Sequence, residues 1–83
     1  DSILIKLSTL INAYKKSKDK SLINLVYYLI DRSFFQKIQN NKKELEFLLD
    51  TKSSIVKIIN NFVQFNLNIN SVMNSIETKL NNV

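Results

Sequence analysis

The chain of 83 residues contains neither glycine nor proline, and this absence narrows the folds open to it more than any motif does. Tight β-hairpin turns depend on glycine, and most other turns favour glycine or proline. A β-rich fold of this length needs several such turns, whereas helices joined by polar loops need none. The sequence therefore predicts an all-α protein, and its length predicts a single helical domain over residues 1–83.

A domain this small usually gains its stability from disulfides, a metal, self-association or very regular helix packing. The chain has no cysteine and no histidine. Disulfides are therefore excluded, and the common ligand sets for zinc, copper and haem are missing. We expect no cofactor, and we expect stability to come from helix packing and self-association.

Hydrophobic periodicity predicts two shorter helices in the first half of the chain. The first covers about residues 2–16, because its apolar residues recur at spacings of four, three and four. These residues are Ile3, Leu7, Leu10 and Tyr14. A polar connection follows, in which Asp19 or Ser21 caps the next helix. The second helix, about residues 21–38, is apolar on nearly all sides, which is typical of a helix at the centre of a core or an interface.

The second half of the chain carries a heptad pattern with uninterrupted spacings of three and four. Its positions are Leu45, Leu48, Lys52, Ile55, Ile59, Phe62, Asn66, Ile69, Met73, Ile76, Leu80 and Val83. This pattern predicts one long helix over about residues 42–81, roughly 60 Å in length, on which the two shorter helices pack. Small polar residues near 50–53 and 66–71 favour caps, and a break at either place would give a four-helix bundle.

Apolar side chains outside the heptad seam predict a homodimer, because one covering layer of helices would leave part of that surface wet. In the dimer the long helices or the second helices pack against each other. Asn66 either specifies the register of this contact from a core position or lies at a local bend that faces water. The aromatic members of the predicted interface would fit a core equally well. The interface candidates are Tyr27, Tyr28, Phe34, Phe35, Ile59, Phe62, Asn66, Ile69 and Met73.

A cluster of lysines is the best candidate for a polyanion site in this chain, whose net charge is +5. Lys15, Lys16, Lys18 and Lys20 lie within six residues on the first connection. They could bind a sulfated glycan, a phospholipid or a nucleic acid, or they could form a solvated loop. A chain with one arginine is poorly equipped to read base edges, so nucleic acid is the least favoured of these ligands.

No catalytic constellation is present, because the chain lacks the histidine and cysteine that general-base and nucleophilic catalysis most often use. Glu44, Glu46 and Asp50 gather near the start of the long helix. Acidic residues at that position are explained by the helix dipole, and a helix does not supply the carbonyl ligands of a calcium site. We therefore expect a non-enzymatic protein with no catalytic residues and no metal.

Asn, Lys and Ile make up 34 of the 83 residues, which indicates an AT-rich genome. Segments 42–50 (KKELEFLLD) and 58–63 (IINNFV) carry a helical texture that runs through the whole chain. In this texture the chain resembles the small all-helical surface lipoproteins of Borrelia-type spirochaetes, although apicomplexan and mollicute proteins share the composition.

The resemblance implies a lipidated cysteine and a tether upstream of Asp1 and a location on the outer membrane. It also implies contact with host or vector molecules, such as a host protein or an acidic polysaccharide. Any membrane attachment would then be made through the upstream anchor. The alternative is a cytoplasmic structural protein that oligomerises through its long helix.

Overall fold

Four helices form the part of the chain that the computed structural model describes, residues 2–40 and 44–83. They are α1 (Ser2–Ser17), α2 (Lys20–Asn40), α3 (Leu45–Phe65) and α4 (Ile69–Asn81). No strand occurs within those two ranges. The all-α prediction is confirmed. The first two helices begin and end within two residues of the predicted bounds.

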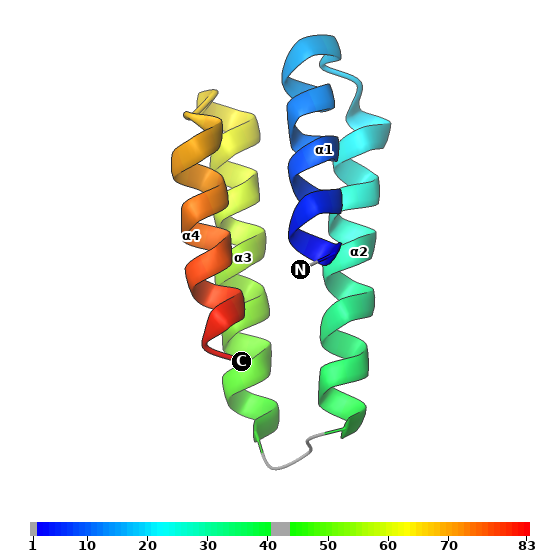
Figure 1. The fold of residues 1–83 in the computed structure, drawn as a ribbon, viewed down its shortest axis with the longest axis vertical. Coiled ribbons are helices and arrows are strands. Elements are labelled where there is room, and N and C mark those ends of the chain that lie inside the picture. The colour runs from blue at the N-terminus through cyan, green and yellow to red at the C-terminus, as the bar shows by residue number, and fades with distance from the viewer. Residues whose placement is uncertain (1, 41–43) are drawn as a thin grey trace.

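The helices form an up-down-up-down bundle in which each helix is antiparallel to the next along the chain (Figure 1). α1 packs on α2 and α4, and α3 packs on α2 and α4. The bundle measures 40 × 21 × 20 Å. α2 and α3 have 21 residues each and project beyond the shorter α1 and α4 at the end opposite the α1–α2 turn.

The predicted long helix over 42–81 is wrong, because the chain turns at residues 66–68. Asn66 has φ 53° and ψ 49°, the left-handed conformation that ends a helix, and its N–H donates to the Phe62 carbonyl at 2.9 Å. Asn68 then caps α4, since its side chain accepts from the Ser71 N–H at 3.1 Å. The predicted start at residue 42 lies outside the described residues, and α3 continues without a break through 50–53.

The core is built from one stripe of each helix, and these stripes meet along the bundle axis. Its buried apolar members are Leu7, Ile11, Tyr14, Ile23, Val26, Ile30, Phe34, Leu48, Ile55, Ile59, Phe62, Val72 and Ile76. Tyr14 and Phe62 meet edge to face across the bundle, with ring centroids 6.1 Å apart.

The predicted heptad seam departs from the observed core at several positions: Leu45 and Asn66 are exposed, and two further differences concern Lys52 and Met73. Thr51 is buried where the pattern placed Lys52, which is half-buried and pairs with Asp31. Val72 is buried and Met73 is half-buried, because the turn at residues 66–68 resets the helical register before α4 begins. A single uninterrupted heptad is therefore not the pattern that builds this core.

Candidate functional site

The α1–α2 turn closes at Lys18, which adopts the left-handed conformation with φ 59°. Its backbone N–H donates to the Tyr14 carbonyl at 2.7 Å and so ends α1. Glycine is the usual residue for this conformation, and lysine takes it here at a cost of about 1 kcal/mol. Lys18 therefore occupies the residue of this turn whose backbone conformation favours glycine over any residue with a side chain.

Asp19 immediately precedes α2, and its carboxylate caps that helix. Its Oδ1 accepts from the Ser21 hydroxyl at 2.8 Å and from the Ser21 N–H at 3.0 Å. These bonds, that of the hydroxyl first, lower the pKa of Asp19 below its ordinary value. The prediction that Asp19 or Ser21 caps the second helix is confirmed, with Asp19 as the capping residue.

The Lys18 side chain joins this turn to the turn between α3 and α4. Its ammonium Nζ lies 3.4 Å from Asn66 Oδ1 and 5.6 Å from the centre of the Tyr14 ring. The second contact places the ammonium against the negative face of the ring. Lys18 is thus held in place by residues from two other parts of the fold.

The four predicted lysines lie at this end of the bundle, in the segment that we call the lysine turn (residues 15–20), but only Lys18 lies on the connection. Lys15 and Lys16 belong to the last turn of α1, and Lys20 is the first residue of α2. Lys16, Lys18 and Lys20 are exposed, and Lys15 is half-buried. None of them has an acidic side chain within ion-pair distance in the described part of the chain. Four lysines and one aspartate give the lysine turn +3 of the net charge of +5.

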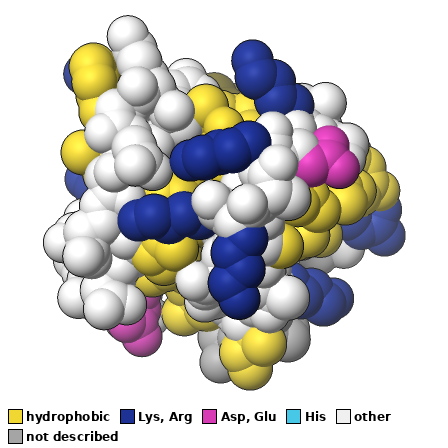
Figure 2. All heavy atoms as spheres, turned by 90° about the horizontal axis from the view of Figure 1, so that it is seen from above, with side chains coloured by type: hydrophobic (Ala, Val, Ile, Leu, Met, Phe, Trp, Pro, Cys, Tyr) yellow, Lys and Arg dark blue, Asp and Glu magenta, His cyan; other side chains and the backbone are white. Residues whose placement is uncertain are grey.

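Exposed apolar side chains accompany the lysines at this end. Phe65, at the last position of α3, is 62% exposed, and Leu67, in the next turn, is 40% exposed. Figure 2, which looks onto this end, shows lysine and arginine side chains lying across and beside hydrophobic ones. The surface therefore combines fixed positive charge with apolar contact area.

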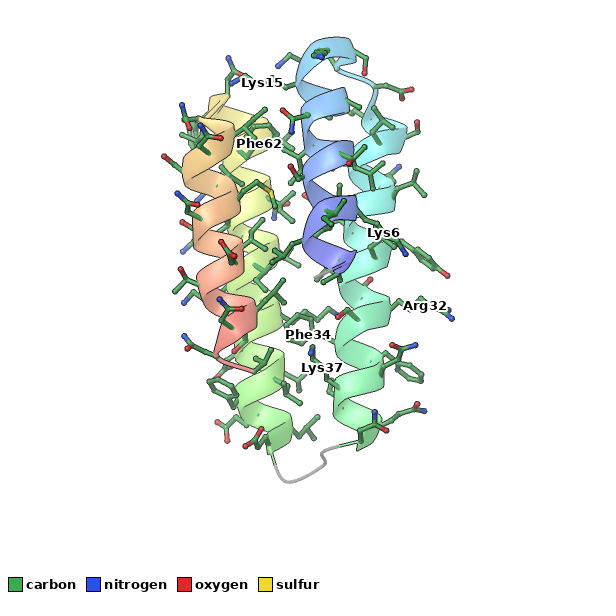
Figure 3. All side chains as sticks on the ribbon, viewed as in Figure 1. Lys6, Lys15, Arg32, Phe34, Lys37 and Phe62 are labelled. Atoms are coloured by element: carbon green, nitrogen blue, oxygen red, sulfur yellow. The ribbon has the colours of Figure 1, made fainter. Side chains whose placement is uncertain are left out.

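The aromatic residues predicted as interface candidates divide between the core and the surface. Phe34 is buried and points into the bundle (Figure 3). Tyr27 is half-buried, its hydroxyl donates to the Asn60 side chain, and burial raises its pKa. Tyr28 and Phe35 are exposed on the outer side of α2. Of these four aromatic residues, Tyr28 and Phe35 are therefore the two whose side chains a partner could contact over most of their surface.

The remaining interface candidates lie on α3 and α4. Ile59 and Phe62 are buried in the chain's own core, where a partner cannot reach them in this fold. Asn66 is exposed at the bend, as one of its two predicted alternatives described, so it occupies no core position. Ile69 and Met73 are half-buried.

A shallow groove of about 480 Å³ runs between the outer sides of α2 and α3. Tyr28, Phe34, Phe35 and Ile38 line it together with the pair formed by Lys52 Nζ and Asp31 Oδ1 at 2.8 Å. Arg32 also lines the groove, and neither Asp31 nor Arg32 was among the site residues predicted from the sequence. The sequence feature that could have indicated these two residues is the presence of adjacent opposite charges within an otherwise apolar helix.

Two further properties bear on the chemistry that the described residues offer. They contain no group of three or more acidic side chains placed to hold a metal ion. No helix among them combines the length and hydropathy that crossing a membrane requires.

Compared with known proteins, the chain matches no family model, no curated protein and no solved structure.

Proposed function

We propose that this chain is a non-enzymatic interaction domain that binds an acidic polysaccharide through the lysine turn. The observation that carries the proposal is the group of four lysines without acidic partners among the described residues, one of them fixed between Tyr14 and Asn66. Like charges held close together repel each other, and a bound polyanion relieves that repulsion. Asp19, whose carboxylate is hydrogen-bonded in the helix cap, keeps its negative charge and offsets one of the four lysine charges, so the lysine turn retains +3.

A sulfated glycan suits this surface better than a nucleic acid. Lysine acts as a point charge, which matches separate sulfate groups, while base recognition relies on the forked donors of arginine. The single arginine, Arg32, lies in the middle of α2, away from the lysine turn (Figure 3). Phe65 and Leu67 add apolar surface against which a sugar ring can pack.

We further propose that the domain is displayed on an outer cell surface through a lipid anchor upstream of Asp1, where it meets host or vector molecules. α1 runs from the N-terminus toward the lysine turn over 16 residues, about 24 Å. A tether at residue 1 would therefore leave the lysine turn distant from the point of attachment, which supports a binding role for it. The intact mass of the native full-length protein tests this step, and a chain without acyl groups overturns it.

Heparin binding tests the role of the lysine turn with two variants of equal charge. Lys16→Gln/Lys18→Gln/Lys20→Gln removes three exposed charges from the turn, and Lys6→Gln/Lys57→Gln/Lys79→Gln removes three exposed charges elsewhere. We expect the first variant to lose about tenfold or more in affinity and the control to lose much less, with wild-type binding that weakens steeply as salt rises. Equal losses in the two variants would show that net charge alone acts.

Single-stranded DNA and vesicles of anionic phospholipid, measured at the same ionic strength, complete the comparison. Tighter binding to either than to heparin would assign the lysine turn to a different ligand.

The alternative function, an intracellular protein that assembles through its helices, is favoured by the exposed aromatic residues Tyr28 and Phe35. Under that alternative the native protein carries no acyl group, and its stable form is an oligomer.

A further inference from the structure

The helices α1 and α3 end in the same way and at the same end of the bundle (Figure 1). Lys18 and Asn66 both have a left-handed backbone, with φ 59° and φ 53°, and the N–H of each donates to the carbonyl four residues earlier, at 2.7 and 2.9 Å. Those carbonyls belong to Tyr14 and Phe62, whose rings meet edge to face. The two helix ends are therefore held side by side, and their left-handed residues touch through Lys18 Nζ and Asn66 Oδ1 at 3.4 Å.

The backbone at residue 66 does not explain the contact that its side chain makes. Ending α3 needs only a left-handed residue, and glycine fills that position with less strain than asparagine. Asn66 is exposed, and its amide Nδ2 has no hydrogen-bond partner in the part of the chain that the structure describes. Because Oδ1 and Nδ2 belong to one amide, these free donors lie beside the Lys18 ammonium.

The Lys18 ammonium also keeps a donor for a ligand. An ammonium carries three N–H groups. One of them donates to Asn66 Oδ1, and the face of the Tyr14 ring, with its centre 5.6 Å from Nζ, can take a second. One N–H of an exposed, fixed cation is then left next to the free amide donors of Asn66.

We infer that Asn66 is a binding residue of the same site, and that one sulfate group of the glycan lies between Lys18 and Asn66. This inference rests on the proposed function and extends the site from the lysine turn to the turn between α3 and α4. Two oxygens of one sulfate accept from the ammonium and from Nδ2 together, and hydrogen bonds to a charged group are the stronger kind. Phe65 and Leu67, exposed on either side of Asn66 in the sequence, place apolar surface where the sugar ring that carries this sulfate would lie.

Asn66→Gly tests this role, because glycine keeps the left-handed backbone and the net charge and removes only the side chain. We expect its affinity for heparin at fixed ionic strength to fall about fivefold or more in isothermal titration calorimetry, since the amide donor and the contact that holds Lys18 are both lost. Asn82→Gly is the matched control. Asn82 is an exposed residue that follows α4, away from the lysine turn, and its variant should bind as the wild type does.

A double-mutant cycle with Lys18→Ala tests whether the two side chains bind one group. If they do, the loss caused by Asn66→Gly should shrink to about twofold or less when Lys18 is already alanine. A residue that only shapes the turn would weaken binding by the same factor in both backgrounds. Circular dichroism verifies that each variant keeps its helical content.

Heparin binding by Asn66→Gly that is as tight as that of Asn82→Gly overturns the inference, and so does a loss that stays equal in the Lys18→Ala background. Failure of the proposed function has a different signature, because Lys16→Gln/Lys18→Gln/Lys20→Gln would then bind heparin as its equal-charge control does. If that triple variant binds weakly while Asn66→Gly binds normally, the proposed function stands and the site ends at the lysine turn.

Discussion

Two asparagines determine whether the second half of the chain forms two helices or one. Asn66 supplies the left-handed residue that ends α3, and Asn68 supplies the side-chain cap that starts α4. The flanking sequence otherwise keeps a helical pattern across this point. Replacing both residues, Asn66→Ala with Asn68→Ala, should therefore weaken the turn and favour a straight helix.

The size of the effect follows from the less favourable backbone conformation at residue 66 and the hydrogen bond lost at residue 68. Alanine in the left-handed region costs about 1 kcal/mol more than asparagine, whose short polar side chain tolerates that region. Removing the hydrogen bond from Ser71 N–H to Asn68 Oδ1 costs about 1 kcal/mol. We expect the free energy of unfolding to fall by about 2 kcal/mol in urea titrations followed by circular dichroism, with Tm lower by roughly 10 °C.

Asn66→Gly is the matched control, because glycine adopts the left-handed conformation without strain. It should change the free energy of unfolding by about 0.5 kcal/mol or less. At high concentration the double-alanine variant should also form a domain-swapped species, detectable by light scattering, in which α3 and α4 join into one helix. A double-alanine variant as stable as the wild type would refute the role assigned to the two asparagines.

Three further predictions concern the core and the first cap. A double-mutant cycle between Tyr14→Leu and Phe62→Leu should give a coupling energy of about 1 kcal/mol in urea titrations, and no coupling would mean that the edge-to-face contact contributes nothing beyond burial. Thr51→Val should change the free energy of unfolding by about 0.5 kcal/mol or less, because the described residues contain no buried side-chain oxygen without a hydrogen-bond partner and the substitution therefore relieves no desolvation cost, and a gain above about 1 kcal/mol would contradict this reasoning. The folded-state pKa of Asp19 lies below its ordinary value of 3.8, so its contribution is present above that pH and disappears as the pH falls through the folded value. The stability difference between the wild type and Asp19→Ala should therefore shrink on acidification, and a difference that is constant from neutral pH to below pH 3.8 would contradict this cause.

The bounds of the first two helices could be predicted closely because the boundary between them is determined by interactions between neighbouring residues. Asp19 followed by Ser21 is a capping pattern that depends on neighbouring residues alone. The turn at residues 66–68 uses the same kind of local signal, and it is one of the two weak points that the sequence indicates. The other weak point, 50–53, stays helical because Thr51 is packed in the core between the buried residues Leu48 and Ile55. That packing depends on the helices beside α3, namely α2 and α4, and could not be predicted from the segment itself.

The candidate site was predictable in part for the same reason. The lysine cluster is contiguous in the sequence, so its members were certain to lie together. The contact between Lys18 and Asn66 joins residues 48 positions apart, and only the bundle brings them within reach. The exposure of Tyr28 and Phe35 could not be predicted, because a helix with apolar residues on nearly all sides does not reveal which side faces the core.

Lys18 allows stability and binding to be separated at one residue. Lys18→Gly removes the strain of a left-handed lysine, but it also loses the contacts with Tyr14 and Asn66 and adds freedom to the unfolded chain. These effects oppose each other, so the free energy of unfolding should change by about 0.5 kcal/mol or less. Lys18→Ala keeps the strain and loses the contacts, and it should unfold about 1 kcal/mol more easily. Both variants lack the ammonium that the fold holds in place, so both should bind heparin more weakly to a similar degree. If Lys18→Gly binds heparin as the wild type does, lysine occupies this strained position for some reason other than the charge it presents.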